Sequence, residues 1–189
     1  MESKRIAGVS GSLRDASYTR VAVRNALRAA ETEGAETNHI DLRGYDLPVF
    51  DPDVDVEDGS RLRREIRDAD AVVLGTPMYH GSYASPLKNA LDYCGFDEFE
   101  DKTVGLLAVS GGRFPVTALE HLRSTCRALN AWVIPHQAAV PNSSAAFENG
   151  EFVEDGTRER VEKLGRDVVK FAGVGDCENF EGDENVGAD

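Results

Sequence analysis

The sequence has 189 residues, 41% of them hydrophobic, and a formal net charge of -13 at pH 7. A chain of this length buries one core and has little room for a second domain, so we expect one domain over residues 1–172. The acidic balance argues against a nucleic-acid partner, because phosphates would be repelled. No signal peptide is recognisable and no apolar stretch approaches the roughly 20 residues of a membrane span. We therefore expect a cytoplasmic protein with no membrane partner.

The remaining composition argues against stabilising metals and disulfides. Cys94, Cys126 and Cys177 are widely separated, and the four histidines have no carboxylate or cysteine at metal-ligand spacing. Residues 173–189 are acidic and glycine-rich, which is typical of a disordered tail. An acidic surface also keeps a protein soluble in a salty cytosol, so a halophilic source is a hypothesis.

Short apolar runs alternate along the chain with segments of helical periodicity. The runs predict strands over residues 5–10, 37–42, 71–76, 104–110 and 132–134. Helices are expected from the loop after the first strand to residue 34, and then over residues 60–68, 85–93, 117–129 and 157–171. A long loop should run through residue 149. This alternation predicts an α/β fold with a doubly wound parallel sheet of five strands and right-handed crossovers.

The loop after the first strand, SGSLRDASYT over residues 10–19, has the composition of a phosphate site. It leads into a helix, whose free N–H groups favour an anion. Ser12, Ser17 and Thr19 can donate hydrogen bonds, Gly11 allows close approach, and Arg14 offers a charged fork. Neither G-x-x-x-x-G-K-[ST] nor G-x-G-x-x-G occurs here, which favours a single terminal phosphate. An ordinary helix-capping loop is the alternative.

The loop after the third strand, TPMYHGSYASPLKNALD over residues 76–92, supplies aromatic side chains, small residues and backbone amides. In a doubly wound sheet this loop and the first one meet beyond the carboxyl ends of the strands, where ligands bind. A flat ring joined by a chain to a phosphate fits there, and FMN has that shape. His80 is a candidate either for proton transfer or for packing at the ring edge.

The stretches GSLRDASYTR, PMYHGSYASPLKNALDY and SGGRF together resemble the NADPH-dependent FMN reductase family, over about residues 4–141. The resemblance implies a flavodoxin-like fold with strand order 2-1-3-4-5, bound FMN, NADPH or NADH as co-substrate, and a homodimer or homotetramer. It also implies an enzyme that reduces small acceptors such as quinones or flavins, with the flavin itself carrying the chemistry.

The same resemblance assigns fifteen residues to the cofactor. The residues expected to hold the phosphate are Ser10, Ser12, Arg14, Ser17 and Thr19. Tyr18 stands where many members of the family have asparagine, and it is expected to contact the cofactor through its backbone. The flavin ring is expected to lie along Pro77, Met78, Tyr79, His80 and Gly81, with Ser110, Gly111, Gly112 and Arg113 at its other edge. A flavodoxin-type electron carrier is the alternative function.

Two assignments remain open between alternatives at this stage. Leu87, Ala90 and Leu91 recur at helical spacing and could contact a second subunit or face the chain's own core. Arg113 could attract the phosphates of the nicotinamide nucleotide or pair with surface acids.

Overall fold

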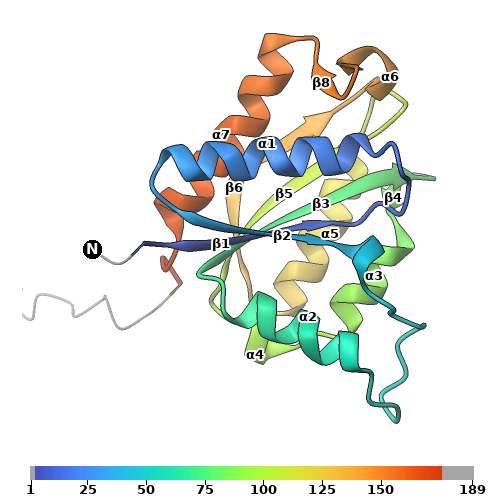
Figure 1. Ribbon diagram of the computed structural model, residues 1–189, viewed down its shortest axis with the longest axis vertical. Coiled ribbons are helices and arrows are strands. Elements are labelled where there is room, and N and C mark those ends of the chain that lie inside the picture. The colour runs from blue at the N-terminus through green and yellow to red at the C-terminus, as the bar shows by residue number, and fades with distance from the viewer. Residues whose placement is uncertain (1–2, 176–189) are drawn as a thin grey trace, which may run out of the picture.

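The computed structural model describes residues 3–175, so most of the predicted tail lies outside the described residues, and the domain boundary at residue 172 stays a prediction. A central parallel sheet is covered by helices on both faces (Figure 1). In the order in which they pair, the parallel strands are β2 (Glu36–Asp41), β1 (Arg5–Ser10), β3 (Ala71–Tyr79), β5 (Thr103–Val109) and β6 (Trp132–Val140). Numbered along the chain without the short β4, this order is 2-1-3-4-5, which confirms the predicted flavodoxin-like sheet.

Three short strands lie outside this parallel series. β4 (Ser82–Tyr83) pairs antiparallel with the end of β3, and β7 (Phe147–Glu148) pairs with β8 (Glu151–Phe152) in a separate hairpin.

The helices divide between the two faces of the sheet (Figure 1). One face carries α1 (Tyr18–Thr32) and α7 (Asp155–Phe171). The other carries α2 (Glu57–Arg67), α3 (Ser85–Asp92), α4 (Phe96–Phe99) and α5 (Val116–Ala128). A 3-10 turn η1 (Leu42–Gly44) follows β2, and a short helix α6 (Ser143–Ala146) follows β6.

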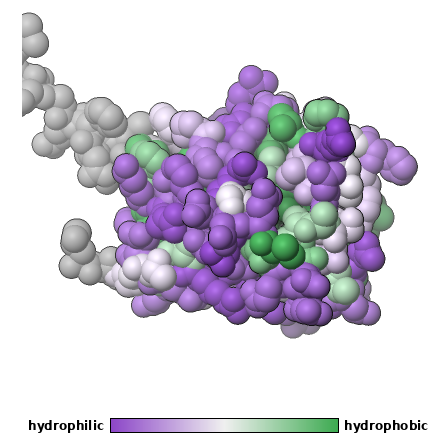
Figure 2. All heavy atoms as spheres, turned by 90° about the horizontal axis from the view of Figure 1, so that it is seen from above, coloured by the Kyte–Doolittle hydropathy of each residue, from purple (hydrophilic) through white to green (hydrophobic). Residues whose placement is uncertain are grey.

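The central strands are buried on both faces, which is why they appear in the sequence as continuous apolar runs. Every residue of β5 is buried. One apolar cluster lies under α1 and α7, and a second lies under α2, α3, α4 and α5. When the molecule is turned so that it is seen from above, its surface is mostly hydrophilic, with scattered hydrophobic residues (Figure 2). Within the described residues, no helix is both long and apolar enough to cross a membrane.

Two strands are longer than predicted, because each continues through a proline. β3 passes Pro77, which pairs with Val109 of β5. Pairing between β3 and β1 ends at Gly75, so the missing N–H of Pro77 is tolerated where β3 has become an edge. β6 passes Pro135, and its register against β5 shifts between Val104 and Leu106. A bulge of this kind accommodates proline without breaking a regular ladder.

Other predicted boundaries need correction. The second helix begins at Glu57, with Val56 as its N-cap, so residue 60, the predicted start, lies inside the helix. Glu57 and Asp58 in the first turn favour that earlier start by facing the positive end of the helix dipole. The predicted loop through residue 149 contains α6 and the first strand of the β7–β8 hairpin.

Glycines bring α1 close to its neighbours. A Cβ on Gly75 of β3 would lie 2.2 Å from Cγ2 of Val23, and one on Gly8 of β1 would lie 2.8 Å from the side chains of Val23 and Leu27. On its other side, α1 packs against α7, where a Cβ on Gly165 would lie 1.9 Å from the carbonyl oxygen of Ala26. At these three glycines, therefore, no side chain of β1, β3 or α7 separates that element from α1.

Gly165→Ala should destabilise the protein, because the clash is with backbone and α1 and α7 would have to separate. Overpacking of this kind costs about 1–3 kcal/mol, measurable as a lower midpoint of urea unfolding. Gly156→Ala on the same helix is the matched control, since a Cβ there meets nothing within 4 Å. The control should be neutral or stabilising by up to about 1 kcal/mol. Equal midpoints for the two variants would contradict the close contact between α1 and α7.

Candidate functional site

A pocket of about 310 Å³ opens beyond the carboxyl ends of β1, β3 and β5. It brings together parts of all three predicted loops. Of the predicted residues, its lining includes Ser12, Arg14, Ser17, Tyr18, Thr19, Pro77, Met78, Tyr79 and Gly111. Ala16, Val109 and Ser143 also line it and were not predicted.

The first loop presents hydrogen-bond donors to this pocket. Ser17 is the N-cap of α1, and its hydroxyl accepts a hydrogen bond from the amide of Arg20 at 3.1 Å. Among the described residues, no protein acceptor lies within hydrogen-bond reach of the amides of residues 15–19 or of the hydroxyl of Thr19. Ser12 and Thr19 are nevertheless only 3% and 2% exposed. A helix N-terminus with unpaired amides and buried hydroxyls has the donor set that a phosphate requires.

Gly11 holds the start of this loop against β3. Its amide donates to the carbonyl of Gly75 at 2.8 Å, and a Cβ would lie 2.8 Å from the Cβ of Leu87 in α3. The loop is therefore fixed between strand and helix at a position where no larger residue fits.

The second loop is a tight hairpin. Tyr79 pairs with Ser82 across a two-residue turn, in which His80 and Gly81 have φ angles of 50° and 80°. Two positive φ angles at the centre of a two-residue hairpin are typical of a type I′ turn, which favours Asn-Gly. The turn leaves Tyr79 half exposed at the pocket, while Met78 accepts a hydrogen bond from Thr117 at 3.6 Å.

Residues 141–152 form a wall on one side of this pocket, and the sequence did not predict it. The amides of Asn142 and Ser143 donate to the carbonyls of Gly112 and Ser110, both at 2.9 Å. These two hydrogen bonds attach the segment to the third loop, and Ser143 lines the pocket.

The same segment also contacts the first loop through aromatic rings. Phe147 stacks on Tyr18 with ring centroids 4.7 Å apart and an interplanar angle of 7°, and Phe152 packs on Phe147 at 4.4 Å. Tyr18 therefore packs against the wall as well as lining the pocket.

Six predicted residues lie outside the pocket lining: Ser10, His80, Gly81, Ser110, Gly112 and Arg113. The hydroxyl of Ser10 is within 2.8 Å of Nε2 of His39, and the hydroxyl of Ser110 donates to the carbonyl of Gly112 at 2.7 Å. Burial and the nearby Arg24 lower the pKa of His39, which favours the neutral form of the ring beside Ser10. Arg113 is exposed and has no acidic partner among residues 3–175, so pairing with a surface acid is not seen there.

The open question about the third helix is answered by burial. Leu87, Ala90 and Leu91 are all buried in the chain's own core. The nearby Cys94 is partly buried and Cys126 in α5 is fully buried, and desolvation raises the pKa of each thiol to about 12.

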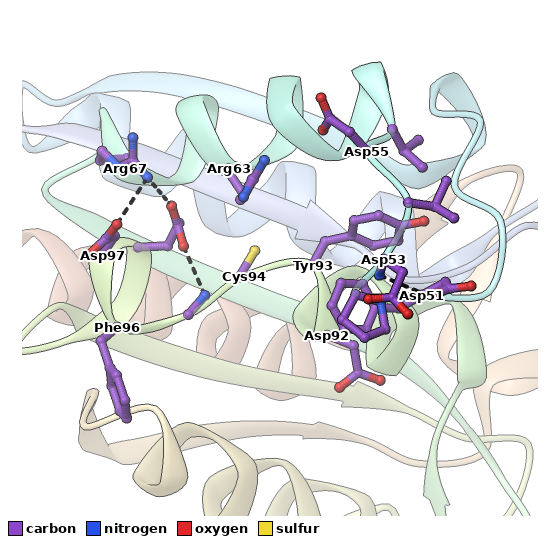
Figure 3. A pocket seen from close by; sticks show the side chains of 16 residues that line it. Asp51, Asp53, Asp55, Arg63, Arg67, Asp92, Tyr93, Cys94, Phe96 and Asp97 are labelled. Carbon is purple, nitrogen blue, oxygen red and sulfur yellow. Dashed lines mark hydrogen bonds and ion pairs between the residues drawn. The ribbon is translucent and has the colours of Figure 1, made fainter.

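A second pocket, of about 640 Å³, lies between residues 50–56, α2 and the junction of α3 with α4 (Figure 3). Two cations line it, Arg63 and Arg67. Arg67 is paired with Asp97 and with the buried Glu98, which also accepts a hydrogen bond from the amide of Gly95 at 2.8 Å. The other acids on its rim are Asp51, Asp53, Asp55 and Asp92. This excess of carboxylates disfavours a phosphate, so the smaller pocket is the better candidate.

The fold and the smaller pocket define an α/β protein of flavodoxin-like topology with a donor-lined pocket at the carboxyl ends of its strands, where such sheets bind their ligands. Residues 4–145 match the family model for NADPH-dependent FMN reductase. An FMN-dependent NADPH-azoreductase of Staphylococcus aureus (strain USA300) is 35% identical over 152 residues, which cover 76% of this chain and 81% of the relative.

Solved structures share the fold. A flavoenzyme NAD(P)H:(acceptor) oxidoreductase from Paracoccus denitrificans has a TM-score of 0.75 and 22% identity, covering 89% of this chain and 97% of that one. An NADH:FMN oxidoreductase in its apo form has a TM-score of 0.74 and 22% identity, covering 90% of each chain.

This chain belongs to the NADPH-dependent FMN reductase family. It is accordingly an oxidoreductase, and its cofactors are FMN and a nicotinamide nucleotide.

The hairpin turn predicts how His80 can be replaced. His80→Asn should keep the stability within about 0.5 kcal/mol, because asparagine tolerates positive φ. His80→Val should cost about 1–2 kcal/mol, because a β-branched side chain is strained in the left-handed region. Urea unfolding of both variants provides the measurement, and a valine variant as stable as the asparagine variant would contradict the turn geometry.

Proposed function

We propose that the protein transfers hydride from NADPH or NADH to FMN and electrons onward to quinones, flavins or azo compounds, in a ping-pong sequence. The observation that carries this proposal is the donor cradle of the first loop, in which the amides of residues 15–19 have no acceptor within residues 3–175 and lie beside the hydroxyls of two buried residues, Ser12 and Thr19. Such a cradle matches the phosphate monoester of FMN and leaves little room for the attached nucleotide of FAD.

Each loop has its own part in this proposal. Ser12, Ser17, Thr19 and the adjacent amides bind the phosphate, and Arg14, exposed at the rim, adds a charge-assisted contact. Pro77, Met78 and Tyr79 lie along the ring, and Gly111 approaches it from the third loop. The bound flavin supplies the redox chemistry, and the chain supplies position and electrostatics.

The remaining predicted cofactor residues support this arrangement indirectly. Ser10, Ser110 and Gly112 shape the backbone of the loops through their hydrogen bonds, and His80 and Gly81 form the hairpin turn. Exposed Arg113 has the charge to attract the phosphates of the nicotinamide nucleotide.

The shape of the pocket supports the proposed ping-pong sequence. The ring is bounded by the second and third loops, so the nicotinamide and the acceptor have to use the same open side in turn. The exposed side chains of Tyr79 and Phe114 at these loops offer flat apolar surface, which suits planar acceptors. A flavodoxin-type carrier would share the fold and cofactor, but family membership disfavours it.

We also propose a homodimer or homotetramer in the cytoplasm. The buried side chains of α3 are unavailable for a subunit contact, so the support is elsewhere. Phe50, Val54 and Phe96 lie at the larger pocket and are 39%, 54% and 56% exposed. Apolar side chains gathered on a surface are typical of protein interfaces.

The phosphate site predicts that FMN binds more tightly than riboflavin. The double variant Ser12→Ala with Arg14→Ala should weaken FMN binding about a hundredfold or more, because a hydrogen bond to a charged group is worth roughly 1.5–3 kcal/mol. Riboflavin binding should be unchanged. Flavin fluorescence titration measures both, and circular dichroism checks the fold. An unchanged affinity for FMN in the folded variant would place the phosphate elsewhere.

If hydride passes from the nicotinamide nucleotide to FMN, as proposed, NADPH or NADH should rapidly bleach the bound FMN under anaerobic conditions. Initial rates against a quinone should give parallel double-reciprocal lines. Light scattering on the same preparation should give two or four times the mass of a 20.5 kDa chain. Reduction by a one-electron donor but by neither nucleotide would favour the electron carrier, and a monomeric mass would remove the oligomer.

A further inference from the structure

Arg20, in the first turn of α1, contacts the outside of the phosphate loop. Its side chain is only 12% exposed. The guanidinium donates to the backbone carbonyl of Arg14 at 3.4 Å and, in a closer contact, to the carbonyl of Asp15. Arg20 was not predicted, because an arginine in a helix is usually a solvated surface residue.

These two contacts orient the peptide groups of the loop. In a trans peptide the carbonyl of one residue and the N–H of the next lie in one plane and point in opposite directions, and the described chain contains no cis peptide. Holding the carbonyls of Arg14 and Asp15 toward Arg20 therefore turns the N–H groups of Asp15 and Ala16 away from it. Neither N–H group has an acceptor among residues 3–175, and Ala16 lines the pocket.

The guanidinium is itself held in place by charge. Asp41, at the end of β2, lies 3.5 Å from Nη1 of Arg20. Arg43 in turn pairs with Asp41 at 2.7 Å and with Asp15 at 3.2 Å. The end of the second strand is thus connected to the first loop at both ends of a series of alternating charges, which runs from Arg20 through Asp41 and Arg43 to Asp15.

We propose that Arg20 is a positioning residue that turns the amides of Asp15 and Ala16 into the phosphate pocket. The proposal rests on the proposed FMN site, and it assigns Arg20 no contact with the phosphate. Because both of its terminal nitrogens are engaged by loop carbonyls and Asp41, its effect on the ligand is transmitted through the backbone. A guanidinium suits this role better than an ammonium, since its fixed fork can hold two carbonyls at once.

The test compares Arg20→Ala and Arg20→Lys with Arg28→Ala, titrating each with FMN and with riboflavin. Arg28 is an exposed residue of the same helix with no side-chain partner among residues 3–175. Arg20→Ala should weaken FMN binding roughly tenfold to a hundredfold and leave riboflavin within twofold, because only the phosphate uses the loop amides. Arg20→Lys should recover part of the loss, and Arg28→Ala should match the wild type.

A second readout follows the amides themselves. In ¹⁵N-labelled protein, inorganic phosphate should shift the amide resonances of Asp15 and Ala16 in the wild type and shift them less in Arg20→Ala. If Arg20→Ala does not fold, Asp41→Asn provides the same test, because it releases one side of the guanidinium. Asp41→Asn should weaken FMN binding in the same direction but by a smaller factor.

The outcomes separate this inference from the proposed function. Wild-type FMN affinity in folded Arg20→Ala, alongside a loss in the Ser12/Arg14 double variant, would overturn the role of Arg20 and keep the phosphate site. Equal losses for FMN and riboflavin in Arg20→Ala would also overturn it, because they would indicate a general collapse of the pocket. No preference for FMN over riboflavin in the wild type would overturn the phosphate site itself.

Discussion

The close seating of α1 on the sheet is the constraint on which the rest of the structure depends. The helix reaches the carboxyl ends of β1 and β3 because Gly8 and Gly75 present no side chain beneath it, and Val23 fills the space above both. A thicker contact would lift the N-terminus of α1 away from Gly11 and the strand ends. The loop can therefore be short, and its amides converge on one small volume. The packing of α1 against β1 and β3 thus determines where the amides of the first loop lie.

Local and overall electrostatics oppose one another in this molecule. The chain carries a net charge of -13, yet the phosphate loop is surrounded by Arg14, Arg20 and Arg43 and by the positive end of a helix. Long-range repulsion of an anionic ligand is screened within about 8 Å at physiological ionic strength. Contacts inside the pocket are shorter than that, so the local donors dominate once the ligand has arrived. The acidic surface then affects the rate of approach more than the strength of binding.

The architecture was predictable because its signals are local. Buried parallel strands give continuous apolar runs, and serine and glycine before a helix indicate where a phosphate can sit. The wall formed by Ser143 and Phe147 was not predictable, because nothing in PNSSAAFENG indicates that it packs on Tyr18, more than a hundred residues earlier in the chain. The role of Arg20 was missed for a related reason. Two of its partners are backbone carbonyls, and the sequence does not indicate the direction in which a backbone carbonyl points.

The unequal burial of Cys94 and Cys126 has a consequence for chemical durability. An enzyme that passes electrons to quinones, as proposed, works among electrophiles that add to sulfur, and the thiolate is the form that reacts. With pKa values of about 12, Cys94 and Cys126 are almost entirely protonated at neutral pH. The side chain of Cys126 is also enclosed by the core under α5, whereas Cys94 is only partly buried and lines the larger pocket. Alkylation or oxidation should therefore be slower at Cys126 than at Cys94, so that the first chemical damage by reactive acceptors falls on the edge of the larger pocket and leaves the core intact.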